Sequence, residues 1–206
     1  MSKNSLIILG LILVLIVAGS VVAIGQLSNA VTVDIKTNGS EVTVSTSTGL
    51  FGHAPTAMEE KIVQYCSEVI KDPDSTVESI KNKVTDITQE YNYNNVKVNI
   101  KSQFGENQLP MPAVVSGNSM YPTLKDGQEL MVLKTDNFKV GDIVISKHPE
   151  YDLIVKRVGK IQGDKVYLIS DNKEVKTTYE GNYIITETPL NTWVPKSYIV
   201  GVVEDY

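Results

Sequence analysis

A serine stands in a short turn whose composition could prepare its hydroxyl for nucleophilic attack. Residues 113–115 form an extended run, Gly117 and Asn118 follow in the turn, and Pro122 stiffens the exit after Ser119. A hydroxyl on a rigid turn, beside backbone N–H groups that no regular structure uses, suits a nucleophile with an oxyanion site. An ordinary serine in a proline-terminated turn is the alternative, and this segment alone does not separate the two.

A lysine inside an apolar run could supply the base that such a serine needs. Side chains in the segment 152–158 alternate between two faces of a predicted strand, so Lys156 and Arg157 project from opposite faces, each among aliphatic neighbours. Burial can lower the pKa of a lysine by several units from about 10.4, and a neutral amine near pH 7 is a competent base for a serine. The alternative is a lysine at a strand edge whose ammonium group reaches water.

Composition removes several classes of function. The 206 residues include 19 basic and 24 acidic side chains, and the net charge of −5 argues against a nucleic-acid partner, which would favour a basic surface. One cysteine, Cys66, excludes an internal disulfide framework, and two isolated histidines exclude a Cys/His zinc cluster. No metal and no cofactor is predicted.

One segment is apolar enough to span a membrane. Leu6–Gly25 contains Ser20 as its only polar side chain, and twenty helical residues cover roughly 30 Å, the thickness of the hydrocarbon core. A cleaved signal peptide is the alternative, but its apolar region usually runs about 7–15 residues. The segment therefore predicts an uncleaved transmembrane helix after a short cytoplasmic head, residues 1–5, in which Lys3 weakly favours an internal amino terminus.

The chain between this anchor and the serine predicts a small α+β segment, residues 26–112. Asn38-Gly39 lies between alternating apolar residues, Asp72-Pro73 interrupts a helical pattern, and Ser75 or Thr76 can cap the helix that follows. The predicted elements are a hairpin over 31–48, helices over 57–71 and 75–91, a strand over Val96–Ile100, and a loop with two prolines over Gln103–Pro112, where we place the domain boundary.

Residues 113–206 predict a β-rich domain. Short runs of β-forming residues alternate with turns such as Asp-Gly and Gln-Gly-Asp, a spacing typical of a compact barrel or sandwich. The predicted strands are Glu129–Leu133, Asp142–Ser146, Leu153–Val158, Lys165–Ile169, Tyr183–Thr186 and Tyr198–Val203.

Four sequence boxes in this domain carry a family resemblance. In order they are SGNSMYPTL, KVGDIVI, IVKRV and GDKVYLISDN, and together they resemble the type I signal peptidases, which share a clan with LexA-like peptidases. The likeness covers roughly residues 113–203. It implies a mainly antiparallel β catalytic domain with an N-terminal transmembrane anchor, in which substrate binds as an added strand.

The resemblance also implies roles for individual residues. Ser119 would be the nucleophile, its N–H would help hold the oxyanion, and Lys156 would be the general base. The residues implied to line the substrate cleft are Met120, Val115 and Gly117. Those implied to support the site are Asp142, Arg157 and Asp171, with Arg157 paired to Asp171.

Three positions depart from the family pattern. Gly117 stands where some members have an oxyanion serine, although others also have glycine. One branch of the family has histidine where this chain has Lys156; His148, eight residues before it, is the disfavoured alternative base, because Lys156 fits the box and His148-Pro149 is typical of a turn. No serine clearly follows Ser170-Asp171-Asn172 to orient the lysine, which leaves Thr177 or Thr178 as substitutes.

These observations predict a membrane-anchored serine endopeptidase that removes signal peptides from exported preproteins. It would be a single-pass protein of the cytoplasmic membrane whose catalytic domain lies outside, with preproteins and the lipid bilayer as partners. A LexA-like self-cleaving Ser–Lys protease and a non-catalytic membrane-anchored β binding module are the alternatives. No motif assigns a partner to residues 26–112.

Overall fold

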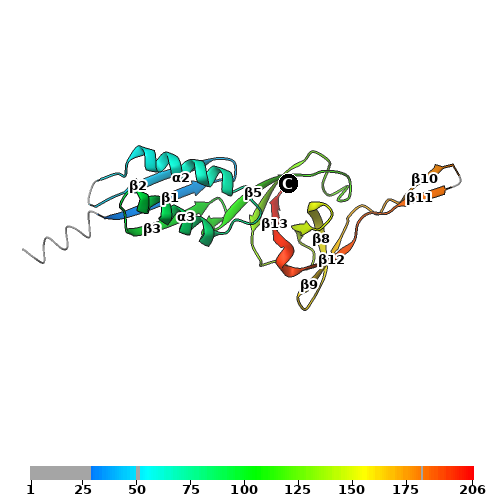
Figure 1. The fold of residues 1–206 in the computed structure, drawn as a ribbon. Coiled ribbons are helices and arrows are strands. Elements are labelled where there is room, and N and C mark those ends of the chain that lie inside the picture. The colour runs from blue at the N-terminus through cyan, green and yellow to red at the C-terminus, as the bar shows by residue number, and fades with distance from the viewer. Residues whose placement is uncertain (1–28, 50–51, 182) are drawn as a thin grey trace, which may run out of the picture.

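The computed structural model describes residues 29–49, 52–181 and 183–206, so the anchor predicted at Leu6–Gly25 lies outside the described residues. Within the described ranges, no helix is both long and apolar enough to cross a bilayer. The described chain forms two units, each built on its own sheet (Figure 1).

The first unit is a four-stranded sheet with the order β2-β1-β3-β4, packed against two helices. Its elements are β1 (Ala30–Thr37), β2 (Val42–Ser47), α2 (Thr56–Val69), α3 (Val77–Glu90), β3 (Asn95–Ser102) and β4 (Gly105–Glu106). β1 and β2 form the predicted hairpin, in which the Asn38 side chain accepts hydrogen bonds from the N–H groups of Ser40 and Glu41. The helices complete a crossover from β2 to β3, which runs parallel to β1.

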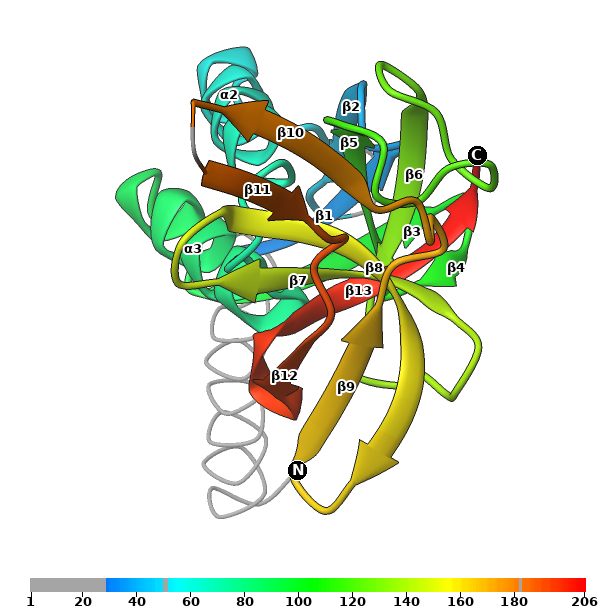
Figure 2. The ribbon, with the colours of Figure 1, turned by 90° about the vertical axis from the view of Figure 1, so that its right-hand side faces the viewer.

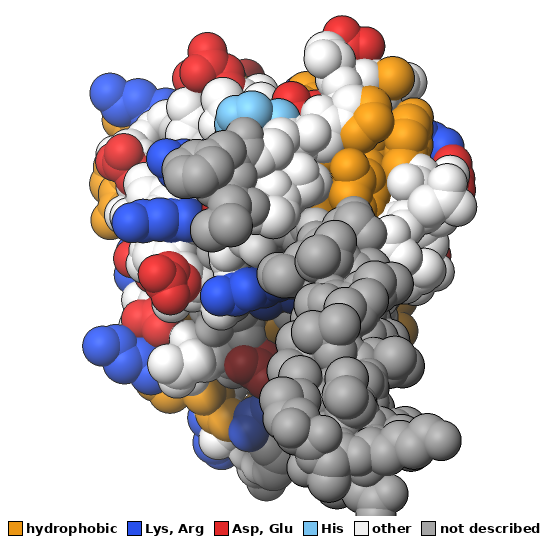
Figure 3. All heavy atoms as spheres, turned by 90° about the vertical axis from the view of Figure 1, so that its left-hand side faces the viewer, with side chains coloured by type: hydrophobic (Ala, Val, Ile, Leu, Met, Phe, Trp, Pro, Cys, Tyr) orange, Lys and Arg blue, Asp and Glu red, His pale blue; other side chains and the backbone are white. Residues whose placement is uncertain are grey.

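Both predicted helices are present, and their apolar residues pack with those of β1 and β3 in the core of this unit. Thr76 caps α3 and shares a capping box with Ser79, which resolves the choice between Ser75 and Thr76. Cys66 of α2 is completely buried, and burial raises the pKa of its thiol to about 12. On the face of this unit in Figure 3, the lysine and acidic side chains of the described residues are interspersed.

The second unit is a seven-stranded antiparallel sheet with the order β12-β9-β8-β7-β13-β6-β5, which curls round on itself (Figure 2). Its strands are β5 (Leu109–Val114), β6 (Glu129–Lys134), β7 (Ile143–His148), β8 (Asp152–Gln162), β9 (Lys165–Ile169), β12 (Thr192–Pro195) and β13 (Ile199–Asp205), the last preceded by the short 3-10 helix η1 (Lys196–Tyr198). All six predicted strands are present, one of them as part of a separate hairpin. That hairpin, β10 (Lys176–Glu180) with β11 (Tyr183–Glu187), projects away from the sheet (Figure 1).

The prediction of a loop over Gln103–Pro112 is wrong. Gly105–Glu106 forms β4, and Leu109–Val114 forms β5, which pairs with β6 along its whole length. Proline is tolerated in β5 because this strand lies at the edge of the sheet, where a missing N–H removes no ladder hydrogen bond. β12 was not predicted either, because four residues are too few to show a periodicity.

The connection between α2 and α3 attaches the first unit to the second. The ammonium group of Lys134, at the end of β6, donates hydrogen bonds to the Asp72 carbonyl and the Ser75 hydroxyl. Burial lowers the pKa of Lys134 to about 8. Lys147 of β7 forms an ion pair with Asp74 in the same connection. The loop between the two helices is therefore held against β6 and β7.

Candidate active site

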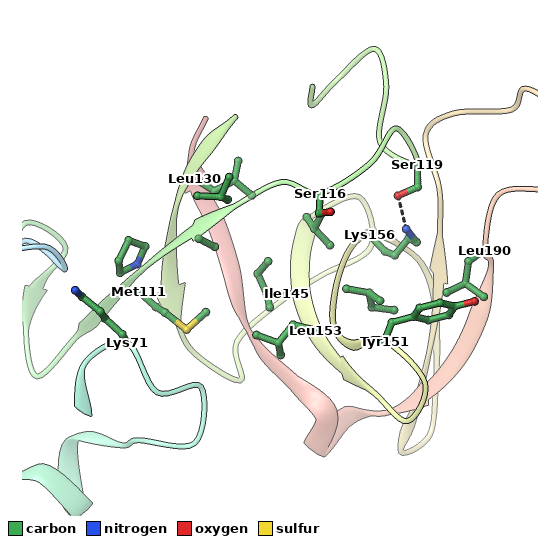
Figure 4. Close-up of a pocket in the computed structure, with 15 residues that line it drawn as sticks. Lys71, Met111, Ser116, Ser119, Leu130, Ile145, Tyr151, Leu153, Lys156 and Leu190 are labelled. Atoms are coloured by element: carbon green, nitrogen blue, oxygen red, sulfur yellow. Dashed lines mark hydrogen bonds between the residues drawn. The ribbon is translucent and has the colours of Figure 1, made fainter. Parts of the chain in front are cut away.

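Lys156 and Ser119 meet at one end of a cleft in the second unit (Figure 4). Strand β8, paired with β7 through Val144, carries Lys156 on its buried face, and the side chain is only 4% exposed. Ser119 follows β5 in the turn toward β6. The lysine amine lies 2.5 Å from the serine hydroxyl. Two side chains that are 37 residues apart in the chain are thus in direct contact.

Burial prepares this lysine to accept a proton. Desolvation disfavours the ammonium form and lowers the pKa of Lys156 to about 8. Among the described residues, no carboxylate lines the cleft to restore the charge. A neutral amine in contact with a hydroxyl can take its proton as the oxygen attacks a carbonyl carbon.

The turn around Ser119 is fixed by the segment that follows β9. The Asn172 N–H donates to the Ser119 carbonyl at 3.0 Å, and the Asn172 side chain donates to the Asn118 carbonyl at 3.0 Å. Gly117 has a φ of +85°, a conformation that favours glycine, and its N–H is bound to the Asp126 carboxylate at 2.7 Å. The Ser119 N–H makes no hydrogen bond to any described residue and is free to bind an oxyanion.

The expected pairing of Arg157 with Asp171 is present and bidentate. Arg157 donates from Nε at 2.8 Å and from Nη2 at 2.6 Å to the two carboxylate oxygens, and from Nη1 to the Gly141 carbonyl at 2.7 Å. The guanidinium lowers the pKa of Asp171. Asp142 accepts the Lys139 N–H at 2.9 Å, which closes the turn before β7. These contacts tie β8, beside Lys156, to the segment that holds the serine turn.

The cleft has a volume of about 530 Å³ and runs from the lysine–serine pair along β5. Figure 4 shows Ser116, Tyr151 and Leu190 near this pair, and Lys71 beside Met111 at the opposite end. Leu190 is held in place because its carbonyl accepts the hydroxyl of the buried Ser170 at 2.8 Å. Apart from Lys71 and Lys156, no lining residue in the described part of the chain carries a charged side chain.

Three residues expected to contact substrate do not line this cleft. The side chain of Met120 is completely buried and that of Val115 is 4% exposed, and both belong to the hydrophobic core beneath the sheet. Val115 directly follows β5 and continues its alternation, so its side chain points inward while those of Val114 and Ser116 line the cleft. Gly117 offers only backbone, and its N–H is occupied by Asp126.

Neither threonine proposed to orient the lysine can do so in this structure. Thr177 and Thr178 are exposed on β10, in the projecting hairpin, where they pair with Thr186 and Ile185. Among the described residues, Ser119 is the only hydrogen-bond partner of the Lys156 amine. His148, the alternative base, contacts the Glu150 N–H and the ring of Tyr151 at the far end of β7.

Sequence reasoning missed Ser116, Leu190 and Lys71. Strand alternation could have identified Ser116, which is two residues beyond Val114 on the same side of the chain. Nothing in the sequence indicates Leu190 or Lys71, because their positions depend on contacts between distant segments. Among the described residues no group of three or more His, Cys, Asp or Glu side chains could hold a metal ion.

Comparisons with known proteins agree on a peptidase. Residues 82–184, half of the chain, match the profile of the family described as Peptidase S24-like. The chain is 42% identical over 83 residues to "Signal peptidase I P" of Bacillus subtilis subsp. natto, a match that covers 35% of this chain and 45% of that protein. It is 38% identical over 96 residues to "Signal peptidase I" of Bacillus licheniformis, covering 44% and 49%.

A third relative, "Signal peptidase IB" of Staphylococcus aureus, is 39% identical over 64 residues, which covers 29% of this chain and 34% of that protein. The matches thus span half or less of the curated relatives. Because the family profile covers half of the chain, this chain belongs to the peptidase S24-like family and is related to the type I signal peptidases.

Proposed function

We propose that this protein is a serine endopeptidase that cleaves signal peptides from exported preproteins, with Ser119 as nucleophile and Lys156 as general base. The observation that carries the proposal is the 2.5 Å contact between the buried Lys156 amine and the Ser119 hydroxyl at the end of an open cleft. The names of the relatives supply the substrate class.

The chemistry follows from this pair. The neutral Lys156 amine takes the hydroxyl proton while Ser119 Oγ bonds to the carbonyl carbon, and the Ser119 N–H stabilises the oxyanion. The Lys156 ammonium then gives its proton to the leaving amine as the peptide bond breaks, which leaves an acyl-enzyme. Lys156 then takes a proton from water as the water oxygen attacks the ester carbon. The Lys156 ammonium returns that proton to Ser119 Oγ as the ester bond breaks, which releases the acid and the free serine.

A substrate in strand conformation fits between the edge of β5 and the beginning of β8. Alternate side chains of such a strand point into the cleft, so positions −1 and −3 before the cleaved bond would enter shallow pockets. In a preprotein that is cleaved after alanine, replacing that alanine with phenylalanine should lower the rate at least about tenfold, because the ring overfills the pocket.

The matched control is phenylalanine at −2, which points away from the cleft and should be tolerated. Purified protein in detergent is incubated with each preprotein, and the products are identified by mass. Absence of cleavage in every preprotein would contradict the proposed function, and equal rates for the two phenylalanine variants would contradict strand-like binding. Cleavage of the enzyme itself without substrate would favour the LexA-like alternative.

We further propose that residues 6–25 anchor the chain in the cytoplasmic membrane, with the peptidase sheet on the outer side. The twenty-residue apolar segment supports this arrangement. A tethered protease searches a thin layer next to the bilayer, which raises its effective concentration near emerging signal peptides. Alkaline carbonate should leave the full-length protein in the membrane pellet. A soluble protein that begins near Gln26 would mean that the segment is a cleaved signal.

A further inference from the structure

The first unit contributes a charged residue to the cleft of the second. Lys71 lies in the connection between α2 and α3, yet it lines the same cleft as Ser119 and Lys156 (Figure 4). Its side chain is exposed, and it forms no ion pair with any described residue. Glu129 and Asp205 line an adjoining hollow of about 600 Å³ that Lys71 also borders, but neither lines the cleft itself. Among the described residues that line the cleft, Lys71 is therefore the one charged side chain apart from the catalytic Lys156, and none is acidic.

The backbone next to Lys71 is held in place rather than left loose. The Asp72 carbonyl accepts a hydrogen bond from Lys134, and Asp74 is paired with Lys147. Both lysines belong to the sheet that carries the active site, one on β6 and one on β7. Lys71 is thus fixed relative to the cleft by its immediate neighbours in the chain.

The edge of β5 offers few backbone N–H donors at the Lys71 end of the cleft. Val115 donates its N–H to the Gln128 carbonyl and accepts the Gly127 N–H, each at 2.9 Å, so its backbone polar groups face β6. Backbone groups alternate along a strand, so those of Pro110, Pro112 and Val114 face the open edge. Two of these residues are prolines without an N–H. A substrate strand finds an N–H donor at Val114, but none at the two prolines farther along.

We propose, on the basis of the proposed function, that Lys71 is a specificity-determining residue that binds a carboxylate side chain at position −5 of the substrate. Pro112, at the Lys71 end of the cleft, and Ser116, beside the catalytic pair, are four positions apart in the chain. Extended chain of that length covers about 13 Å. A strand that runs along β5 with residue −1 beside Ser116, next to the catalytic pair, therefore brings −5 to Lys71. Position −5 also points to the same face as −1 and −3.

The test uses peptides that differ only at −5, where they carry Asp, Asn or Lys. For the wild-type protein, kcat/KM for the Asp peptide should exceed that for the Asn peptide about threefold at low salt, as expected for a solvent-accessible ion pair. The ratio should approach one for Lys71→Ala. For Lys71→Glu the Lys peptide should become better than the Asp peptide. Added salt should weaken the preference of the wild-type protein, because the pair is accessible to counterions.

Lys83→Glu, which reverses an exposed lysine on α3, is the matched control and should keep the wild-type ratio. Moving the Asp to −4 should abolish the preference, since that side chain points away from the cleft. Equal cleavage of the Asp and Asn peptides by the wild-type protein would overturn the role of Lys71 but leave the proposed function standing. So would a preference for Asp that persists in Lys71→Glu. If the wild-type protein cleaves none of the peptides, the result contradicts the proposed function, and the role of Lys71 falls with it.

Discussion

Ser119→Ala, Lys156→Ala and Lys156→Arg should each lower the turnover number at least about a thousandfold, because the two side chains act as one unit. Alanine removes either the attacking oxygen or the proton acceptor. Arginine keeps the charge but cannot serve as a base at any accessible pH. The measurement is single-turnover cleavage of a preprotein, with folding checked by circular dichroism.

Lys160→Ala, which truncates an exposed lysine on the same strand, is the control and should retain full activity. The double variant Ser119→Ala/Lys156→Ala should be no slower than either single variant, since the second change has nothing left to remove. The neutral amine is the active form, so kcat/KM should rise with pH and level off above an apparent pKa of about 8. Full activity in Lys156→Ala would contradict the assignment.

Gly201→Ala should destabilise the protein by about 3 kcal/mol or more, or prevent folding. Gly201 lies in β13, between β6 and β7, where it pairs with Lys134 and Ile145. A Cβ atom at this position would lie 2.2 Å from the Leu133 carbonyl oxygen and 2.8 Å from its carbon. These are backbone atoms, so relief of the clash requires β6 and β13 to separate.

Urea unfolding of the purified protein, followed by tryptophan fluorescence, would measure the change. Val202→Ala is the neighbouring control: it removes two methyl groups from a partly buried side chain and should cost only about 1 kcal/mol. If the Gly201→Ala protein is as stable as the Val202→Ala protein, the prediction is wrong, because β6 and β13 can then separate at this point without lowering the free energy of unfolding.

Much of the fold could be predicted because the decisive signals are local. The Asn38-Gly39 turn, the interruption at Asp72-Pro73 and the alternating apolar residues each depend on a few neighbouring residues, and the corresponding elements are present. Strand β5 was missed for a physical reason. Proline excludes a central strand but permits an edge strand, and only the completed sheet shows that this strand lies at the edge.

The candidate site was also predicted only in part, and again the local features were the predictable ones. The alternation in β8 correctly separates Lys156 from Arg157, and the family boxes predict the partner of each. Burial of Met120 and exposure of Thr177 could not be predicted, because they depend on how the turn packs and where a hairpin points. The contribution of Lys71 depends on the junction between two sheets, for which the sequence carries no motif.

The burial of Cys66 has a practical consequence for following the cleft at work. It is the only cysteine in the chain, it has no exposed surface, and its thiol resists ionisation near neutral pH. Maleimide and iodoacetamide reagents therefore have no native target on the folded protein. A cysteine introduced at Lys71 could carry a fluorophore without prior removal of the native thiol, and its emission would report when a substrate enters the cleft.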